Sequence, residues 1–139
     1  MTDEIYCGRL SVPMTRKIIR HGILNDYEFV ITTLGSHPCA YVIVNENHPF
    51  YQKNLVGELG IVHSDVTYSE AVLTPIVELK DKKWVIGWDY CHAFDYYCID
   101  KDNEYMNMQG KKWSVDEILE DVKLMIDYLI EIKKAPPTP

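Results

Sequence analysis

The stretch from Trp84 to Tyr97 joins an apolar, strand-like run to side chains that can carry out chemistry. The nine residues after position 88 hold two carboxylates, one imidazole and three phenol rings. Such a cluster where a strand ends is typical of a polar ligand pocket or a metal site, and packing alone does not require it. The candidate ligand-binding residues in this stretch are Trp88, Asp89, His92, Asp95 and Tyr96.

Asp89, His92 and Asp95 follow one another at intervals of three residues. Carboxylates and imidazole bind zinc or manganese, and an acid–base pair of this kind can move a proton. The spacing matches no specific zinc signature, so we expect no cofactor and keep a divalent metal as the alternative. The structural alternative is that an aspartate caps nearby backbone groups while His92 packs in the core.

A second polar stretch, residues 63–70, is rich in hydroxyl and carboxyl groups. If it lies beside the strand that ends at Trp88, His63 and His92 can face each other. With an aspartate from the first stretch they could grip a phosphate or act as acid and base. A turn that satisfies its own local hydrogen bonds explains the same residues equally well. The candidate ligand residues here are His63, Thr67, Tyr68 and Ser69, and the candidate catalytic residues are His63, His92, Asp89 and Asp95.

Covalent catalysis by a serine or cysteine has little support in the sequence. Ser69 is not part of a G-x-S-x-G turn, which would expose a nucleophilic hydroxyl. Cys91 lies in an apolar setting that favours an inert thiol. The four cysteines form no C-x-x-C pair, so we expect free thiols and no cysteine-based zinc site.

The bulk properties indicate one domain that does not bind long polyanions. A chain of 139 residues with 47% hydrophobic and 25% charged residues can bury a core of its own. The net charge of -7 argues against binding to a nucleic acid duplex. No apolar run can span a bilayer, and the acidic N-terminus lacks a signal-peptide pattern, so we expect a cytoplasmic protein. We assign residues 1–134 to the domain and 135–139 to a disordered tail.

The elements that must position these residues are predicted from local patterns. Pro13 and Gly22 suit the start and the stop of a short N-terminal helix. His37 and His48 each precede a proline, which predicts rigid turns next to a strand. Lys80 to Lys82 reads as a hairpin turn. The predicted strands are 27–32, 39–44, 75–79 and 83–88, with a further short strand at 61–63.

The C-terminal helix is the most strongly indicated element. Ser114 and Glu117 form a capping box, and apolar residues recur at helical spacing over about 115–133. The fold class is therefore α+β, a mainly antiparallel sheet covered by a long C-terminal helix, with a short N-terminal helix. The apolar face of this helix is wide enough to cover both a sheet and a second subunit, so we expect a homodimer.

Three blocks of the chain resemble a family of small uncharacterised proteins common in phages and prophages. They are HP-x-A-Y-V at 37–42, V-H-x-x-x-T-Y-S at 62–69 and G-W-D-x-x-H-x-x-D at 87–95. The chain departs from the family pattern at Ser64, Asp65 and Phe94, where glycine is usual. The resemblance implies a phage setting and brings no catalytic residues. Small phage accessory proteins often counter host defence.

These observations lead to a binding function as the first hypothesis. We expect a phage-type protein in the host bacterial cytoplasm that counters immunity by binding, either sequestering a nucleotide-derived signal or blocking a defence effector protein. The alternative is a hydrolase, with or without a metal, that acts on a phosphoester or nucleotide through His63, His92, Asp89 and Asp95. A plain interaction module without a small ligand is the third hypothesis.

Overall fold

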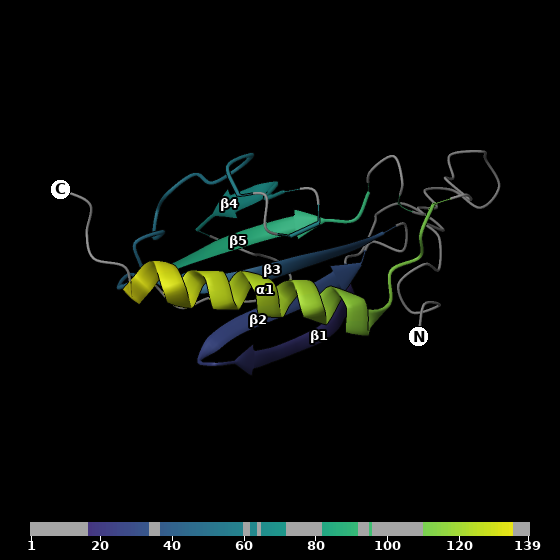
Figure 1. Ribbon diagram of the computed structural model, residues 1–139, viewed down its shortest axis with the longest axis horizontal. Helices are drawn as coiled ribbons and strands as arrows, with labels where there is room; N and C mark the ends of the chain where they lie inside the picture. The colour runs from purple at the N-terminus through teal and green to yellow at the C-terminus, as the bar shows by residue number, and fades with distance from the viewer. Residues whose placement is uncertain are drawn as a thin grey trace.

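The described residues form a five-stranded antiparallel sheet with one long helix on a single face (Figure 1). The structure, a computed structural model, describes residues 17–33, 37–59, 62–63, 65–71, 82–91, 95 and 110–134. The strand order is β1-β2-β3-β5-β4. The α+β class, the antiparallel sheet and its helical cover are therefore confirmed, while the predicted tail at 135–139 lies outside the described residues.

The first element of the described chain is a strand, so the predicted N-terminal helix is wrong over residues 17–22. β1 (Lys17–Leu24) pairs with β2 (Tyr27–Thr33), and Leu24 lies opposite Tyr27. Asn25 and Asp26 both have positive φ, 49° and 69°, as a tight two-residue hairpin turn requires. The β-branched isoleucines of β1 favour this hairpin over a helix. Residues 13–16 lie outside the described residues.

β1 forms an edge of the sheet and is not regular along its length. Its register against β2 shifts between Ile18 and Arg20, which is a β-bulge. Ile18 and Ile23 are 39% and 70% exposed, whereas Ile19 packs in the core. The strand therefore contributes one side chain to the core near its bulge and leaves two large apolar groups at the surface.

β3 (Pro38–Asn45) is the central strand, buried on both faces and paired with β2 and β5 (Lys83–Asp89). The predicted strands 27–32 and 39–44 are confirmed as β2 and β3, which pair in antiparallel fashion. β4 (Tyr68–Glu70) pairs with β5 on its other side, so the polar stretch 63–70 does lie beside that strand. Within the short strand predicted at 61–63, Val62 and His63 are not in a strand. Residues 75–79 lie outside the described residues.

Gly87 occupies a position in β5 that leaves no space for a side chain. Tyr41 lies opposite it on β3, and a Cβ atom at position 87 would overlap the Tyr41 ring. Tyr68 on β4 packs against the same ring, with centroids 5.5 Å apart at 84°. The glycine thus lets two tyrosines from the neighbouring strands meet across β5.

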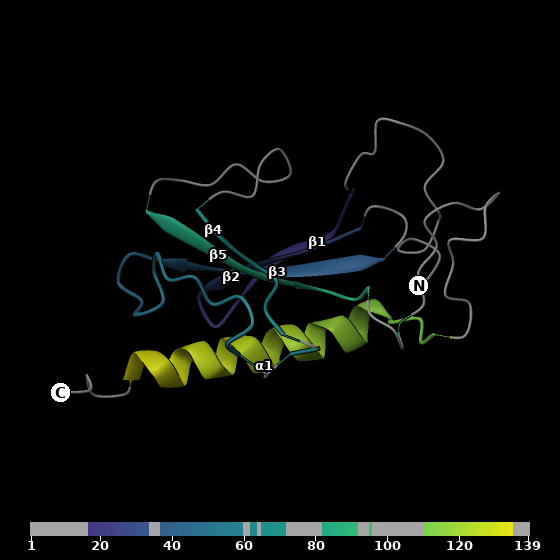
Figure 2. The ribbon, with the colours of Figure 1, turned by 90° about the horizontal axis from the view of Figure 1, so that it is seen from above.

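Helix α1 (Val115–Lys134) begins at the predicted capping box and covers one face of the sheet (Figure 2). The backbone N–H of Glu117 donates to Ser114 Oγ at 3.2 Å, and the backbone N–H of Ser114 donates to Glu117 Oε1 at 3.0 Å. The helix presents an apolar stripe to the sheet; its fully buried members are Ile118, Val122, Met125, Ile126 and Leu129.

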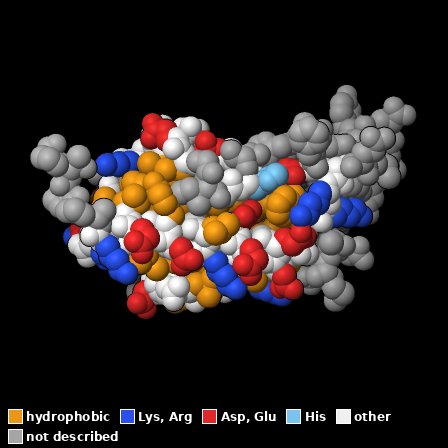
Figure 3. All heavy atoms as spheres, in the orientation of Figure 1, with side chains coloured by type: hydrophobic (Ala, Val, Ile, Leu, Met, Phe, Trp, Pro, Cys, Tyr) orange, Lys and Arg blue, Asp and Glu red, His pale blue; other side chains and the backbone are white. Residues whose placement is uncertain are grey.

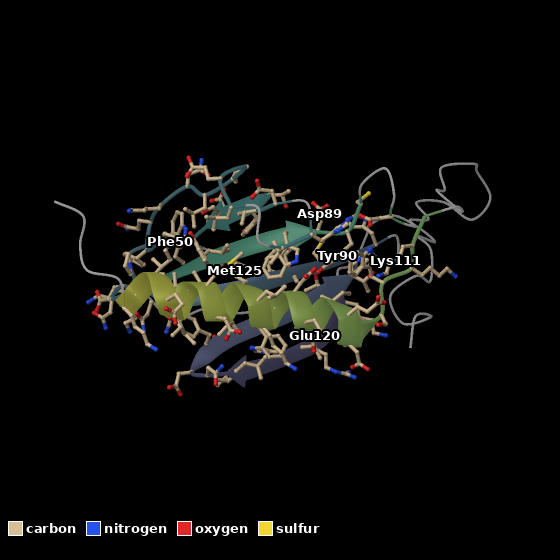
Figure 4. All side chains as sticks on the ribbon, viewed as in Figure 1. Phe50, Asp89, Tyr90, Lys111, Glu120 and Met125 are labelled. Carbon is tan, nitrogen blue, oxygen red and sulfur yellow. The ribbon has the colours of Figure 1, made fainter. Side chains whose placement is uncertain are left out.

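The main core lies between α1 and the sheet, and a smaller cluster lies on the other face. Met125 and Tyr90, both labelled in Figure 4, are fully buried members of this main core. On the other face Val30, Tyr41 and Val85 pack together. No helix in the described part of the chain is long and apolar enough to cross a membrane.

Candidate functional site

A histidine–aspartate pair lies at the end of the molecule where α1 begins. His63 Nε2 lies 2.7 Å from Asp95 Oδ2, although the two residues are 32 positions apart. The side chain of Asp95 is 1% exposed and that of His63 is 21% exposed. The other oxygen of Asp95 accepts a hydrogen bond from Trp113 Nε1 at 2.9 Å. A buried carboxylate therefore holds an imidazole that reaches the surface.

A layer of aromatic rings supports His63 from behind. Its ring stacks on Tyr90, with centroids 5.0 Å apart and an interplanar angle of 1°. Trp113 packs against both rings, at 4.7 Å from His63 and 4.9 Å from Tyr90. These contacts fix the plane of the imidazole, while the bond to Asp95 fixes its rotation. The side chain is thus positioned by the fold before any ligand arrives.

Tyr90 connects this pair to the helix. Its hydroxyl donates to Asp121 Oδ2 at 2.6 Å and accepts from Trp88 Nε1 at 3.0 Å. Burial, aided by the hydrogen bond to Asp121, raises the pKa of Tyr90 far above its ordinary value, so the ring stays a neutral phenol. Trp88 is itself buried on the helix side of β5. It supports the site as part of the core.

The arrangement of His63 and Asp95 suits proton transfer and the binding of anions. With Nε2–H donated to Asp95, the acceptor nitrogen of the neutral ring is Nδ1. The carboxylate counterbalances a positive charge on the ring when that nitrogen takes a proton. The ammonium of Lys111 lies nearby, 4.0 Å from the centre of a Trp113 ring, and pairs with Glu117 Oε2 at 2.6 Å. Figure 4 shows Lys111, Tyr90 and Asp89 toward this end of the molecule.

Asp89 is the last residue of β5, and Thr67 lies directly before β4. Thr67 Oγ1 donates to Asp89 Oδ2 at 3.2 Å, and Asp89 Oδ1 accepts the backbone N–H of Cys91 at 3.3 Å. Asp89 therefore caps backbone at the strand end, as the structural alternative proposed for an aspartate. Burial, with the nearby carboxylates of Asp89 and Asp95, raises the pKa of Cys91 and keeps its thiol protonated. This agrees with the expectation of an inert cysteine.

Ser69 and Tyr68 make contacts that hold neighbouring parts of the sheet together. Ser69 Oγ donates to the carbonyl of Lys53 at 2.7 Å and accepts from Trp84 Nε1 at 2.9 Å. It ties the segment after β3 to the sheet. Tyr68 packs on Tyr41 over Gly87. Neither side chain takes part in the described contacts of the His63–Asp95 pair.

Two predicted site residues, His92 and Tyr96, lie outside the described residues, so the facing of His63 and His92 stays a prediction. Within the described ranges, no three His, Cys, Asp or Glu side chains come together in a way that could hold a metal ion. Three contributors were missed in the sequence: Trp113, Tyr90 and Asp121. The bonds of Tyr90 to Asp121 and of Trp113 to Asp95 span 31 and 18 residues, and Trp113, directly before the capping box, was the most visible signal.

Comparison with known proteins assigns no relative to the chain. No family model, no curated protein and no solved structure matches it. A function must therefore be inferred from the chemistry of the site itself.

Proposed function

We propose that this chain is a phage-type accessory protein that counters bacterial immunity by binding, with a site centred on His63. The observation that carries the proposal is the 2.7 Å contact between His63 and the buried carboxylate of Asp95. A side chain held in place in advance loses little freedom when a ligand binds, which favours affinity. The resemblance to phage proteins supplies the biological setting, the host bacterial cytoplasm.

The chemistry of the site favours an anionic group as the ligand. The imidazole of His63 reaches the surface beside the buried Asp95, and Lys111, which pairs with Glu117 at 2.6 Å, lies on the neighbouring Trp113 ring. The N–H groups of His63 and Lys111 can donate hydrogen bonds to the phosphate of a nucleotide-derived signal, and equally to an acidic group on a defence effector protein. The net charge of -7 disfavours longer polyanions such as a nucleic acid duplex.

Native mass spectrometry of protein purified from its bacterial host tests this proposal. We expect a bound small molecule or a co-purifying protein with the wild type, and its loss with His63→Gln. His21→Gln is the matched control, because His21 also pairs with a carboxylate, Glu28 at 2.5 Å, but on the exposed β1–β2 hairpin. Retention of the same ligand by His63→Gln would contradict the proposal, and loss in both variants would point to a general effect.

A hydrolase is the second candidate, because the same pair suits a general base. His63 would accept a proton from water while the water oxygen bonds to phosphorus and the ester oxygen leaves with a proton. Asp89 caps β5 instead of facing His63 in a described contact, and His92 lies outside the described residues. Incubation with candidate nucleotides, followed by chromatography, separates the two functions. Multiple turnovers would support hydrolysis, whereas unchanged ligand recovered after denaturation supports binding.

A further inference from the structure

A pocket of about 610 Å³ lies at the end of the molecule where α1 ends. Three walls enclose it: the tip of the β1–β2 hairpin, the adjoining ends of β3 and β5, and the last turns of α1. Its volume falls within the range of about 300–1,000 Å³ that is common for small-molecule sites. The 20 residues of α1 span about 30 Å, so this pocket is separate from His63 and independent of the function proposed above.

Three lysines supply positive charge to the pocket. Lys133 and Lys134 come from the last turn of α1, and Lys83 comes from the start of β5. Among the described residues, none of the three forms an ion pair. Lys82, Lys111 and Lys123 do, with Glu46, Glu117 and Glu120 respectively. Ammonium groups from two different elements, without carboxylate partners, are suited to hold a phosphate.

A planar surface lies beside these charges. The ring of Tyr27 is partly buried and meets the edge of His48 at a centroid distance of 6.2 Å and an angle of 82°. His48 is itself fixed, because Nε2 donates to the carbonyl of Leu129 at 2.8 Å and Nδ1 accepts the backbone N–H of Phe50 at 3.0 Å. Ile23 and Ile130 add apolar surface. A flat ligand ring can therefore pack on Tyr27, which is supported by the hydrogen-bonded ring of His48.

The remaining polar groups limit the charge that the pocket accepts. Asp26 and Glu28 line the hairpin wall with Asn25 and Asn45; Glu28 Oε2 pairs with His21, and Asn45 Oδ1 accepts the backbone N–H of Asn47 at 2.9 Å. The carboxylate of Asp26, the second oxygen of Glu28 and the amide oxygen of Asn25 can accept hydrogen bonds from hydroxyl or amino groups of a ligand. Two carboxylates and the negative end of the helix dipole offset much of the lysine charge. One phosphate suits this balance better than an extended polyphosphate.

We propose that this pocket binds a small molecule of mononucleotide size, a monophosphate that carries a planar ring. The phosphate lies against Lys83, Lys133 and Lys134, and the ring packs on Tyr27. The polar groups of the hairpin wall accept hydrogen bonds from the part of the ligand between them. The size of the pocket selects against free phosphate, its charge against a neutral nucleoside, and its ring surface against a sugar phosphate without a base.

Titration of the full chain with AMP, GMP, CMP, UMP and inorganic phosphate, followed by ¹⁵N NMR, tests this site. At least one mononucleotide should give saturable shifts at Tyr27, Asn45 and His48 and leave His63 unchanged. Lys133→Gln with Lys134→Gln should weaken binding by at least about tenfold, because two charge-assisted contacts are lost. The matched control, Lys17→Gln with Lys123→Gln, removes the same charge elsewhere and should keep the wild-type affinity.

Four results would overturn the proposal. They are no saturable shift with any mononucleotide up to about 10 mM, equal weakening in the control pair, inorganic phosphate binding as tightly as the mononucleotides, and shifts centred on His63. Lys83→Gln lies outside the helix and gives a second measure if the helix variants unfold. Because His63→Gln leaves this pocket intact, failure here and failure of the proposed function are distinguished.

Discussion

Two histidines of this chain are held by the fold for opposite purposes. His63 points one nitrogen at a buried carboxylate, which can balance a charge on the ring. His48 spends both nitrogens on backbone groups, the carbonyl of Leu129 and the N–H of Phe50. The first ring has a carboxylate partner and reaches the surface, whereas the second joins the segment after β3 to α1 as a neutral group.

His48 should make stability depend on pH. Burial lowers its pKa below the ordinary 6.5. The neutral ring therefore contributes stability that is fully present above pH 6.5 and is lost as the pH falls through the lower folded pKa. Replacing His48 by Ala should cost about 2–3 kcal/mol at pH 7.5, since two hydrogen bonds and a buried ring are removed. The cost should be smaller at acid pH.

Urea unfolding at pH 7.5 and at acid pH measures this effect. The wild type should lose stability between the two values, and His48→Gln should show a flatter profile because it cannot take up a proton. His21→Gln, which removes an imidazole from the exposed hairpin, serves as the comparison. Parallel profiles for wild type and His48→Gln would show that another group controls the dependence.

Two substitutions of Asp95 should affect stability and ligand binding to different extents. Asp95→Ala removes the acceptor for both Trp113 Nε1 and His63, and should lower the free energy of unfolding by about 1–3 kcal/mol. Asp95→Asn keeps an acceptor and the volume but removes the charge that balances a protonated His63. It should weaken ligand binding more than it lowers stability. Thermal unfolding and a binding titration on both variants check the prediction. If Asp95→Asn binds the ligand as tightly as the wild type, the charge of Asp95 plays no part in binding.

At the scale of elements, local signals predicted most of the fold. The capping box at Ser114 and Glu117 and the helical spacing after it gave α1, and β-branched runs gave β2, β3 and β5. β1 was missed because Pro13 and Gly22 suited a helix and because a short apolar run does not distinguish the periodicity of a helix from that of a strand. The pair Asn25-Asp26 was the available turn signal.

The candidate site could be predicted only in part, for a reason of distance along the chain. His63 and Asp95 were chosen as candidates from their types and neighbours. Their pairing across 32 residues, and the Trp113 bond across another 18, depend on how the loops return to the sheet. No local pattern carries that information. For the same reason the pocket at the end of α1, built from several separate segments, was not foreseen.

Gly87 should be intolerant of even the smallest side chain. Gly87→Ala would force its Cβ into the Tyr41 ring, which is buried between β3 and β4, and should destabilise the protein by about 1–3 kcal/mol. A double-mutant cycle with Tyr41→Ala measures the cause. The same glycine substitution should cost much less once the ring is gone. An unchanged cost in that background would attribute the effect to the backbone of β5.

At the scale of the whole molecule, α1 separates two regions of different chemistry. The His63–Asp95 pair lies where the helix begins, and the lysine pocket lies where it ends. Figure 3 shows acidic and basic side chains mixed with apolar ones along the face that carries α1. The apolar stripe of the helix is buried against the sheet. The sheet of the same protomer therefore covers most of this stripe. Leu124, which is 51% exposed, lies outside it.

The homodimer stays a prediction, and we expect Leu124 to lie in its interface. We expect the wild type to sediment as a dimer at concentrations of about tens of micromolar, a range in which moderately strong association is populated. Leu124→Glu should shift it to a monomer without loss of helix content, because this side chain does not contribute to the core. Glu120→Gln, one turn earlier on the exposed surface, is the control. A wild-type monomer throughout this range would refute the prediction.

The bulge in β1 has a consequence for how the protein avoids aggregation. An edge strand with exposed Ile18 and Ile23 offers apolar surface and backbone hydrogen-bonding groups that another chain can use to extend the sheet. The irregular register at Ile18 and Arg20, with charged Lys17 and Arg20 beside it, interrupts that template. A substitution that straightened β1 would therefore favour fibrils even if it left the folded monomer as stable as before.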